Sequence, residues 1–226
     1  MKTYLCIGAG PGIGLATALH FGRQGYRVVL ASRSAARNAT LQARFKEEGI
    51  EARFESVDSS DPTQVASLID RLSHENLEVV HYNAAVMHYD ASGTLMPSRI
   101  DTQDSRDIAS DISINVSGAL AMLSKIIPAM EARKKGTILL TGGGFGVTPS
   151  ADFLTLSVGK AAARSMVEAL FEPLKARGVH IATVRVSTLV ASDPAHPERI
   201  AEAFWRLHTQ AATEWTWEAL YPALAA

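Results

Sequence analysis

Cysteine is almost absent from this chain. The only thiol, Cys6, has no partner within the sequence, so no internal disulfide can form. Cys6 lies in the apolar run TYLCIG, where a small buried hydrophobic side chain is the simplest interpretation. This cysteine usage is typical of a reducing compartment, and the start MKTYLCIGAG has too few apolar residues for a secretory signal. We therefore expect a soluble cytoplasmic protein.

Other missing features exclude further classes of partner. The net charge is −1, so the basic surface that nucleic-acid binders carry is not expected. No stretch reaches the roughly 20 apolar residues that a membrane-spanning helix needs. The seven histidines show no HxxxH spacing and no cysteine cluster accompanies them, so no metal site is predicted. No GxSxG elbow supports a serine hydrolase.

Apolar runs alternate with helix-like segments along the whole chain. A length of 226 residues with 47% hydrophobic residues fits one α/β domain, residues 1–226. Strands are expected at 3–8, 26–32, 50–57, 77–84, 136–142 and 179–186, and 215–221 could form a last one. Helices are expected near 13–24, 34–48, 62–75, 104–131, 157–177 and 197–210. This alternation predicts a doubly wound Rossmann fold with a mostly parallel, seven-stranded sheet.

A glycine-rich loop, IGAGPGIGLATAL, joins the first strand to the first helix. Its glycines fall at 8, 10, 12 and 14. Small residues let the backbone approach a pyrophosphate, and the helix N-terminus offers unpaired N–H groups and a positive dipole end. A ligand-free strand–helix turn would need only one or two glycines. The loop therefore predicts a dinucleotide site, although Ile13 breaks the general GxGxxG spacing.

The end of the second strand indicates which dinucleotide binds. An NAD site usually places Asp or Glu here to bind the ribose 2′-hydroxyl. This strand ends in VVLASRSAAR, with Ser32 in place of an acid and with Arg33 and Arg37 following. A guanidinium can hold a 2′-phosphate by bidentate hydrogen bonds, so we predict NADP rather than NAD. The alternative for Arg33 is a solvated surface charge.

These residues, with others along the chain, resemble the short-chain dehydrogenase/reductase family in its single-domain form. Gly8, Gly12 and Gly14 are similar to its TGxxxGxG loop, and YNAAV (82–86) is similar to its NNAG segment. Asn115 and Lys160 match two members of its catalytic tetrad. The resemblance implies an oxidoreductase. It also implies cofactor contacts from Gly8, Gly10, Gly12, Ile13, Gly14, Ser32, Arg33, Asp58 (near adenine), Asn83, Ala84, Ala85, Lys160 and Leu189.

Two tetrad positions depart from the family. Its catalytic tyrosine falls on Leu156 and its serine on Gly143, so the tetrad reads Asn115, Gly143, Leu156, Lys160. In the family the tyrosine exchanges a proton with the substrate oxygen. A leucine can neither donate nor accept one. Lys160 is expected to hold the nicotinamide ribose, although a snorkelling lysine at a helix start is the alternative. Leu156 is also spaced to form a packing stripe with Ala163, Val167 and Leu170.

The sequence leaves the proton donor and the exact function open. Substitutes near the gap are Thr148, Asp152, Thr155 and Ser157, and from the fourth-strand segment His81, Tyr82, His88 and Tyr89. The first hypothesis is an NADP-dependent oxidoreductase acting on a small carbonyl or alcohol. The second is an inactive nucleotide sensor, and the third a purely structural protein. Family resemblance also implies a homodimer or homotetramer through the helices near 104–131 and 157–177. Trp205, Trp215 and Trp217 could line the cleft, with core packing as the alternative.

Overall fold

The computed structural model describes residues 1–33, 35–90 and 94–223, and for residues 35–40 it describes the backbone alone. Within these residues seven strands form one sheet in the order β3-β2-β1-β4-β5-β6-β7, and every neighbouring pair is parallel. The strands are β1 (Thr3–Ile7), β2 (Arg27–Ser32), β3 (Ala52–Ser56), β4 (Leu77–Tyr82), β5 (Thr137–Gly143), β6 (His180–Val186) and β7 (Glu218–Tyr221). The predicted Rossmann sheet is confirmed.

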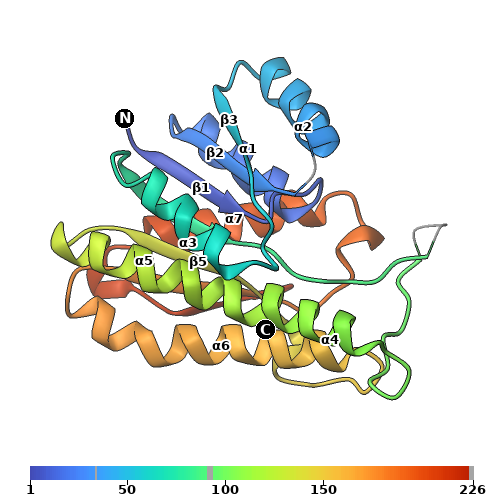
Figure 1. Cartoon of the computed structure of the whole chain (residues 1–226). Helices are drawn as coiled ribbons and strands as arrows, with labels where there is room; N and C mark the ends of the chain where they lie inside the picture. The colour runs from blue at the N-terminus through green and yellow to red at the C-terminus, as the bar shows by residue number, and fades with distance from the viewer. Residues whose placement is uncertain (34, 91–93, 224–226) are drawn as a thin grey trace.

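Helices cover both faces of this sheet (Figure 1). One face carries α3 (Pro62–Arg71), a long helix built from α4 (Ser105–Ile112), the π-helical segment η1 (Ser113–Ser117) and α5 (Gly118–Ala132), and then α6 (Leu154–Lys175). The other face carries α1 (Ile13–Arg23), α2 (Ala35–Glu47) and α7 (His196–Thr209). Short 3-10 turns are η2 (Gly144–Gly146), η3 (Val190–Ser192) and η4 (Ala212–Glu214). Strand order reverses between β1 and β4, so the loops after these strands flank the ligand crevice.

Two hydrophobic clusters lie between the sheet and its helix layers. The central strands are buried on both faces, as their near-continuous Val, Ile and Leu runs predict. Trp215 and Trp217 pack against the cluster under α3, α5 and α6, and Trp205 packs against the cluster under α1 and α7. The three tryptophans therefore contribute to core packing, which was the alternative to lining the cleft.

Helix ends differ from the predictions in two places that matter for the site. The helix expected near 157–177 begins at Leu154. The sequence does not reveal this earlier start, because the N-cap residue, Phe153, makes no side-chain capping bond. Lys160 is therefore in the second turn and not at the helix start. The helix expected near 104–131 contains the π segment η1, which holds Asn115. Such π segments often occur at functional sites.

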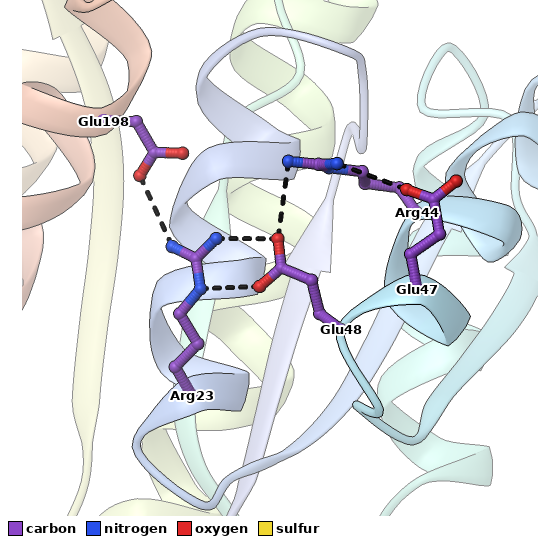
Figure 2. A network of polar contacts seen from close by, with 5 residues as sticks. All are labelled: Arg23, Arg44, Glu47, Glu48 and Glu198. Carbon is purple, nitrogen blue, oxygen red and sulfur yellow. Dashed lines mark hydrogen bonds and ion pairs between the residues drawn. The ribbon is translucent and has the colours of Figure 1, made fainter.

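The ends of three helices on one face are joined by an ion-pair network (Figure 2). Arg23, the last residue of α1, makes two hydrogen bonds of 2.6 and 2.7 Å to the carboxylate of Glu48, just after α2. Arg23 also approaches Glu198 of α7 at 3.7 Å, while Arg44 bridges Glu47 and Glu48. These groups are largely exposed, so the network fixes the geometry of α2 more than it stabilises the fold.

The helix Ser105–Ala132 is long and apolar enough to cross a membrane by length and composition alone. Its position explains this composition, because the face that carries Met122, Ile126 and Met130 is buried against the sheet. Leu120 on another face is half exposed. The apolar character of this helix thus serves packing on the sheet, and its outer face is left open.

Candidate functional site

The glycine loop combines glycines that the fold requires with glycines that it does not. Gly8 has a φ of 89°, and a Cβ there would lie 2.3 Å from the backbone nitrogen of Ala84, so only glycine fits. A Cβ on Gly14 would lie 3.0 Å from the Asn83 side chain. By contrast, a Cβ on Gly10 or Gly12 would meet no atom of the described residues within 4 Å. The loop therefore leaves a cradle in front of the α1 N-terminus, where an anionic ligand is favoured.

The end of β2 lies beside this cradle. The backbone N–H groups of Gly8 and Ala9 both donate to the Ala31 carbonyl, at 2.9 and 3.0 Å, which fixes the loop against β2. Ser32 ends the strand and is buried, and Arg33 follows on the surface. Arg33 makes no ion pair within the described part of the chain. The side chain of Arg37 lies outside the described residues.

Asp58 is held in place after β3. Its carboxylate accepts hydrogen bonds from the backbone N–H of Ser60 at 2.9 Å and from the Ser60 hydroxyl at 2.8 Å. Its own backbone N–H donates to Gln64 at 3.1 Å. These bonds leave the carboxylate partly buried near the same edge of the sheet, because β3 and β2 are neighbours. Ala85 and Leu189 are exposed at the ends of β4 and β6, on that edge as well.

A chain of buried hydrogen bonds connects the strands to the glycine loop. The Asn83 amide donates to the Gly8 carbonyl at 2.9 Å, and the Thr141 hydroxyl donates to the Asn83 oxygen at 2.8 Å. Since that hydroxyl has one proton, it accepts from His81 Nε2 at 2.8 Å, and His81 Nδ1 accepts from the Tyr4 hydroxyl at 2.7 Å. Burial, with the nearby Lys160 charge, lowers the pKa of His81 to about 3, which keeps the ring neutral for this role.

Lys160 and Asn115 meet at a small cavity below this chain. Lys160 Nζ donates to the Thr141 carbonyl at 2.7 Å, and burial lowers the pKa of this amine to about 8. Asn115 is buried, its Oδ1 accepts from the Val86 N–H at 3.2 Å, and its Nδ2 has no partner within the described residues. Both side chains line a cavity of about 10 Å³, the size of one water molecule. The structure thus brings the two retained tetrad positions together.

Gly143 and Leu156, the two tetrad positions that differ from the family, offer no side-chain proton donor. Leu156 is only 7% exposed and shares a face of α6 with buried Ala163 and Val167, so it joins the predicted packing stripe. Gly143 ends β5, and a Cβ there would lie 3.1 Å from Lys160 Cγ. The lysine stem therefore occupies the space beside Gly143. A serine at this position would need that stem to move.

Most of the substitute donors named from the sequence are engaged elsewhere. His81 and Tyr82 lie inside β4, as predicted, and the Tyr82 hydroxyl donates to the Ile114 carbonyl at 2.6 Å. Ser157 Oγ donates back to the Phe153 carbonyl at 2.8 Å. Asp152 is exposed and approaches Arg99 at 3.5 Å. These residues are therefore not placed to replace the tyrosine.

The remaining candidates differ in how firmly they are held. Thr148 is exposed, and the Tyr89 hydroxyl reaches only the Met87 sulfur at 3.7 Å. His88 contacts the buried carboxylate of Asp111 at 3.2 Å, and Thr155 donates to the same carboxylate at 2.7 Å. Sequence reasoning missed Asp111. The signal that could have found it is an acid four residues before Asn115, and so on the same helix face.

The sequence matches the family described as short chain dehydrogenase over residues 2–199. A very-long-chain 3-oxoacyl-CoA reductase of Aspergillus oryzae is 26% identical over 192 residues, which cover 82% of this chain and 53% of that protein. The chain thus spans about half the length of this relative and of a second such reductase, from Coccidioides immitis. An uncharacterized oxidoreductase of Staphylococcus saprophyticus is 26% identical over 217 residues, with 89% of this chain and 88% of that protein covered.

Solved structures agree with the sequence comparison. A metagenomic short-chain oxidoreductase in complex with NADP superimposes with a TM-score of 0.85 and 25% identity, covering 97% of this chain and 96% of the other. A 3-oxoacyl (acyl-carrier-protein) reductase of Agrobacterium tumefaciens with NADP bound has a TM-score of 0.84 at 21% identity, with 97% and 92% covered, and shows the same fold. The resemblance found in the sequence is therefore confirmed, and the chain belongs to the short-chain dehydrogenase family of oxidoreductases.

Proposed function

We propose that this chain is an NADP(H)-dependent oxidoreductase with a non-standard active site, which moves a hydride to or from a small carbonyl or alcohol. The observation that carries the proposal is the Lys160 amine, drawn inward onto the Thr141 carbonyl beside Asn115. A lysine kept only for solubility would reach water, because burying its charge is unfavourable. A buried amine at the carboxyl edge of the sheet has a use when it binds a ligand there.

The residues present fit such a cofactor. The cradle over Gly10 and Gly12, at the α1 N-terminus, suits a pyrophosphate, since a Cβ would meet nothing there within the described chain. The exposed guanidinium of Arg33 suits a 2′-phosphate, and Asp58 would lie near the adenine. Lys160 would hold the nicotinamide ribose hydroxyls. The complexes of relatives with NADP support the choice of this dinucleotide.

The chain's own contribution to the chemistry is binding, orientation and proton control. When bound, the cofactor supplies or accepts the hydride. With a pKa of about 8, Lys160 Nζ releases and regains a proton close to neutral pH, which suits proton exchange with the adjacent cavity. Asn115 fixes the first residues after β4 through Val86 and so holds one wall of the cleft. Leu156 supplies apolar surface and no acid.

A second candidate function rests on Leu156 and Gly143. A family fold without hydroxyl groups at these two positions suits a nucleotide sensor that binds NADP(H) and regulates a partner. The substrate and any partner are equally proposals. The names of these relatives point to the 3-oxo group of an acyl-CoA for those proteins, and this chain covers only about half of their length. We further propose that the chain acts in the cytoplasm, as one domain, in a homodimer or homotetramer built on α5 and α6.

The test is a fluorescence titration of the purified protein with NADPH and, separately, with NADH. We expect saturable binding that favours NADPH at least about tenfold, because a bidentate guanidinium–phosphate contact contributes about 1.5–3 kcal/mol. Arg33→Ala should remove that preference. Arg106→Ala is the matched control, since Arg106 is highly exposed on α4 and pairs only with Asp104. Absence of binding to either dinucleotide would contradict the proposed function.

A further inference from the structure

A buried carboxylate lies where α4 and α6 meet. Asp111 is 2% exposed and accepts hydrogen bonds from Thr155 Oγ1 and Gln103 Nε2, both at 2.7 Å. Its third partner is His88 Nε2 at 3.2 Å. A buried charge is costly unless it is paired. Of these three partners, His88 is the one whose side chain is able to carry a positive charge, and its Nε2 is the atom that faces Asp111.

This pair is adjacent to the position that lacks its tyrosine. Thr155, bonded to Asp111, immediately precedes Leu156 on α6. Asp111 lies four residues before Asn115, about one helical turn. The chain after β4 runs along that helix, with Val86 bonded to Asn115 and His88 bonded to Asp111. The His88 ring is thus held by a carboxylate one helical turn from Asn115, and that carboxylate also bonds the residue before Leu156.

The ring is also free on its other side. The His88 side chain is 39% exposed, although Nε2 is fixed by Asp111. Nδ1 has no hydrogen-bond partner within the described part of the chain. A histidine that a buried carboxylate orients through one nitrogen, with its second nitrogen free, is a common arrangement for general acid–base chemistry. No other substitute named above combines a fixed orientation with a free, titratable nitrogen.

We propose that His88, oriented by Asp111, is the proton donor that takes the place of the absent tyrosine; this rests on the proposed oxidoreductase function. In the reducing direction, the carbonyl carbon of the substrate gains a hydride from a reduced nicotinamide dinucleotide. The carbonyl oxygen, which thereby gains negative charge, forms an O–H bond with the proton of His88 Nδ1, and that N–H bond breaks. Neutral His88 then regains a proton from water at its exposed edge. The reverse sequence oxidises an alcohol.

The first test measures position and does not depend on turnover. The protein is labelled with ¹⁵N in its histidine rings, and long-range ¹⁵N–¹H spectra are recorded with and without saturating NADPH. The His88 signals are assigned by their loss in His88→Gln. We expect them to shift on NADPH addition, whereas the signals of His74, exposed after α3, do not. Unmoved His88 signals in a protein that binds NADPH would overturn the proposal.

The second test measures proton transfer. His88→Gln retains an N–H donor for Asp111, so it preserves the contact but cannot act as an acid. With 2,3-butanedione, cyclohexanone and acetophenone as probes, we expect NADPH oxidation to fall about 10²–10⁴-fold, with NADPH affinity unchanged. The control, His74→Gln, should match the wild type. A wild type that binds NADPH but oxidises it with none of the probes also counts against the proposal and favours the sensor.

Repeating the His88 substitution in a second variant separates an effect on proton transfer from an effect on folding. Leu156→Tyr restores a hydroxyl four residues before Lys160. If His88 is the donor, His88→Gln should cost less than about tenfold in this background, because the tyrosine supplies the proton. An equal loss in both backgrounds would assign His88 a purely structural role. If Leu156→Tyr does not fold, Gln103→Ala replaces it: removing one bond to Asp111 should lower turnover while His88 remains, and full activity would contradict the proposal. Loss of NADPH binding in the wild type would instead refute the proposed function itself.

Discussion

The buried amine of Lys160 lowers the stability of the folded chain while it supports the proposed function. Its amine is drawn into the protein and bonded to the Thr141 carbonyl, so burial lowers its pKa from 10.5 to about 8. At neutral pH both the folded and the unfolded chain carry this charge, and the folded chain bears the cost of burying it. Between pH 8 and pH 10.5 the unfolded chain binds a proton that the folded chain has released. The unfolding free energy contributed by Lys160 therefore rises with pH across that interval.

Replacing Lys160 by methionine should reveal the stability that the buried amine costs. At pH 7 we expect Lys160→Met to be more stable than the wild type by about 1–2 kcal/mol, a discounted figure because the group is only partly buried and its hydrogen bond is lost. The advantage should shrink towards pH 10. Urea unfolding of both proteins at the two pH values measures this difference in unfolding free energy. The other titrating groups are the same in both proteins, so their contributions cancel. A variant that is less stable at pH 7, with an unchanged pH dependence, would contradict the assignment.

Sequence reasoning found Lys160, Asn115 and the glycine loop because each matches a spaced motif whose chemistry is known. It also predicted the packing stripe that contains Leu156. It could not find the stem of Lys160 beside Gly143, because that contact depends on packing between α6 and β5. It placed His81 in the fourth strand, where the structure also has it, but it could not identify the hydrogen bonds of this ring. A histidine in an apolar strand gives no signal of its partners, which come from β1 and β5.

At the scale of elements, β1, β4 and β5 share the hydrogen-bond chain that ends on the glycine loop. Thr141 is its branching point, since its hydroxyl connects His81 to Asn83 and its carbonyl receives Lys160. The strands thereby place the first glycine and the retained lysine through one residue. The nucleotide affinity of this loop should therefore depend on Thr141 of β5, even though the loop itself follows β1.

Thr141→Val should weaken NADPH binding as well as stability. It leaves His81 and Asn83 without their shared partner, so we expect a loss of about 1–3 kcal/mol in unfolding free energy and about tenfold in affinity. Thr141→Ser retains the hydroxyl and should restore both. The matched control is Thr183→Val, which breaks a buried 2.9 Å bond to the Leu140 carbonyl on the same sheet but has no connection to Asn83. Denaturant unfolding and NADPH titration measure both quantities, and equal affinity losses at Thr141 and Thr183 would refute the coupling.

The strands were predictable because buried parallel strands are short apolar runs between polar or glycine boundaries. Even the last strand, expected within 215–221, is present as β7 at Glu218–Tyr221. Two features of the helices were not predictable. The start of α6 has no capping side chain, and the π segment around Asn115 lies against Gly159 of α6, where a Cβ would lie 2.4 Å from Asn115 Cβ. Contacts of this kind arise only when helices meet.

At the scale of the whole molecule, α5 and α6 present apolar surface to solvent. Leu120 of α5 and Val158 of α6 are 50% and 46% exposed, on helices that lie side by side along one face (Figure 1). Ala161 and Ala169 of α6 are exposed as well, so small residues allow a close approach. This exposed apolar surface adds to the buried apolar face of the helix Ser105–Ala132 that packs on the sheet. A second copy of the chain would cover the exposed surface, with two helices from each copy in a bundle.

This proposal predicts a dimer or larger assembly in solution, with a mass that light scattering coupled to size-exclusion chromatography measures directly. Leu120→Arg and Val158→Arg should each produce monomers, because an unpaired guanidinium buried in an apolar interface costs several kcal/mol. Ser73→Arg, at an exposed position after α3, is the matched control and should leave the assembly intact. Because α6 carries Lys160 two residues after Val158, the monomers should also bind NADPH more weakly if the partner supports this helix. A wild type that is monomeric at micromolar concentration would contradict the proposed assembly.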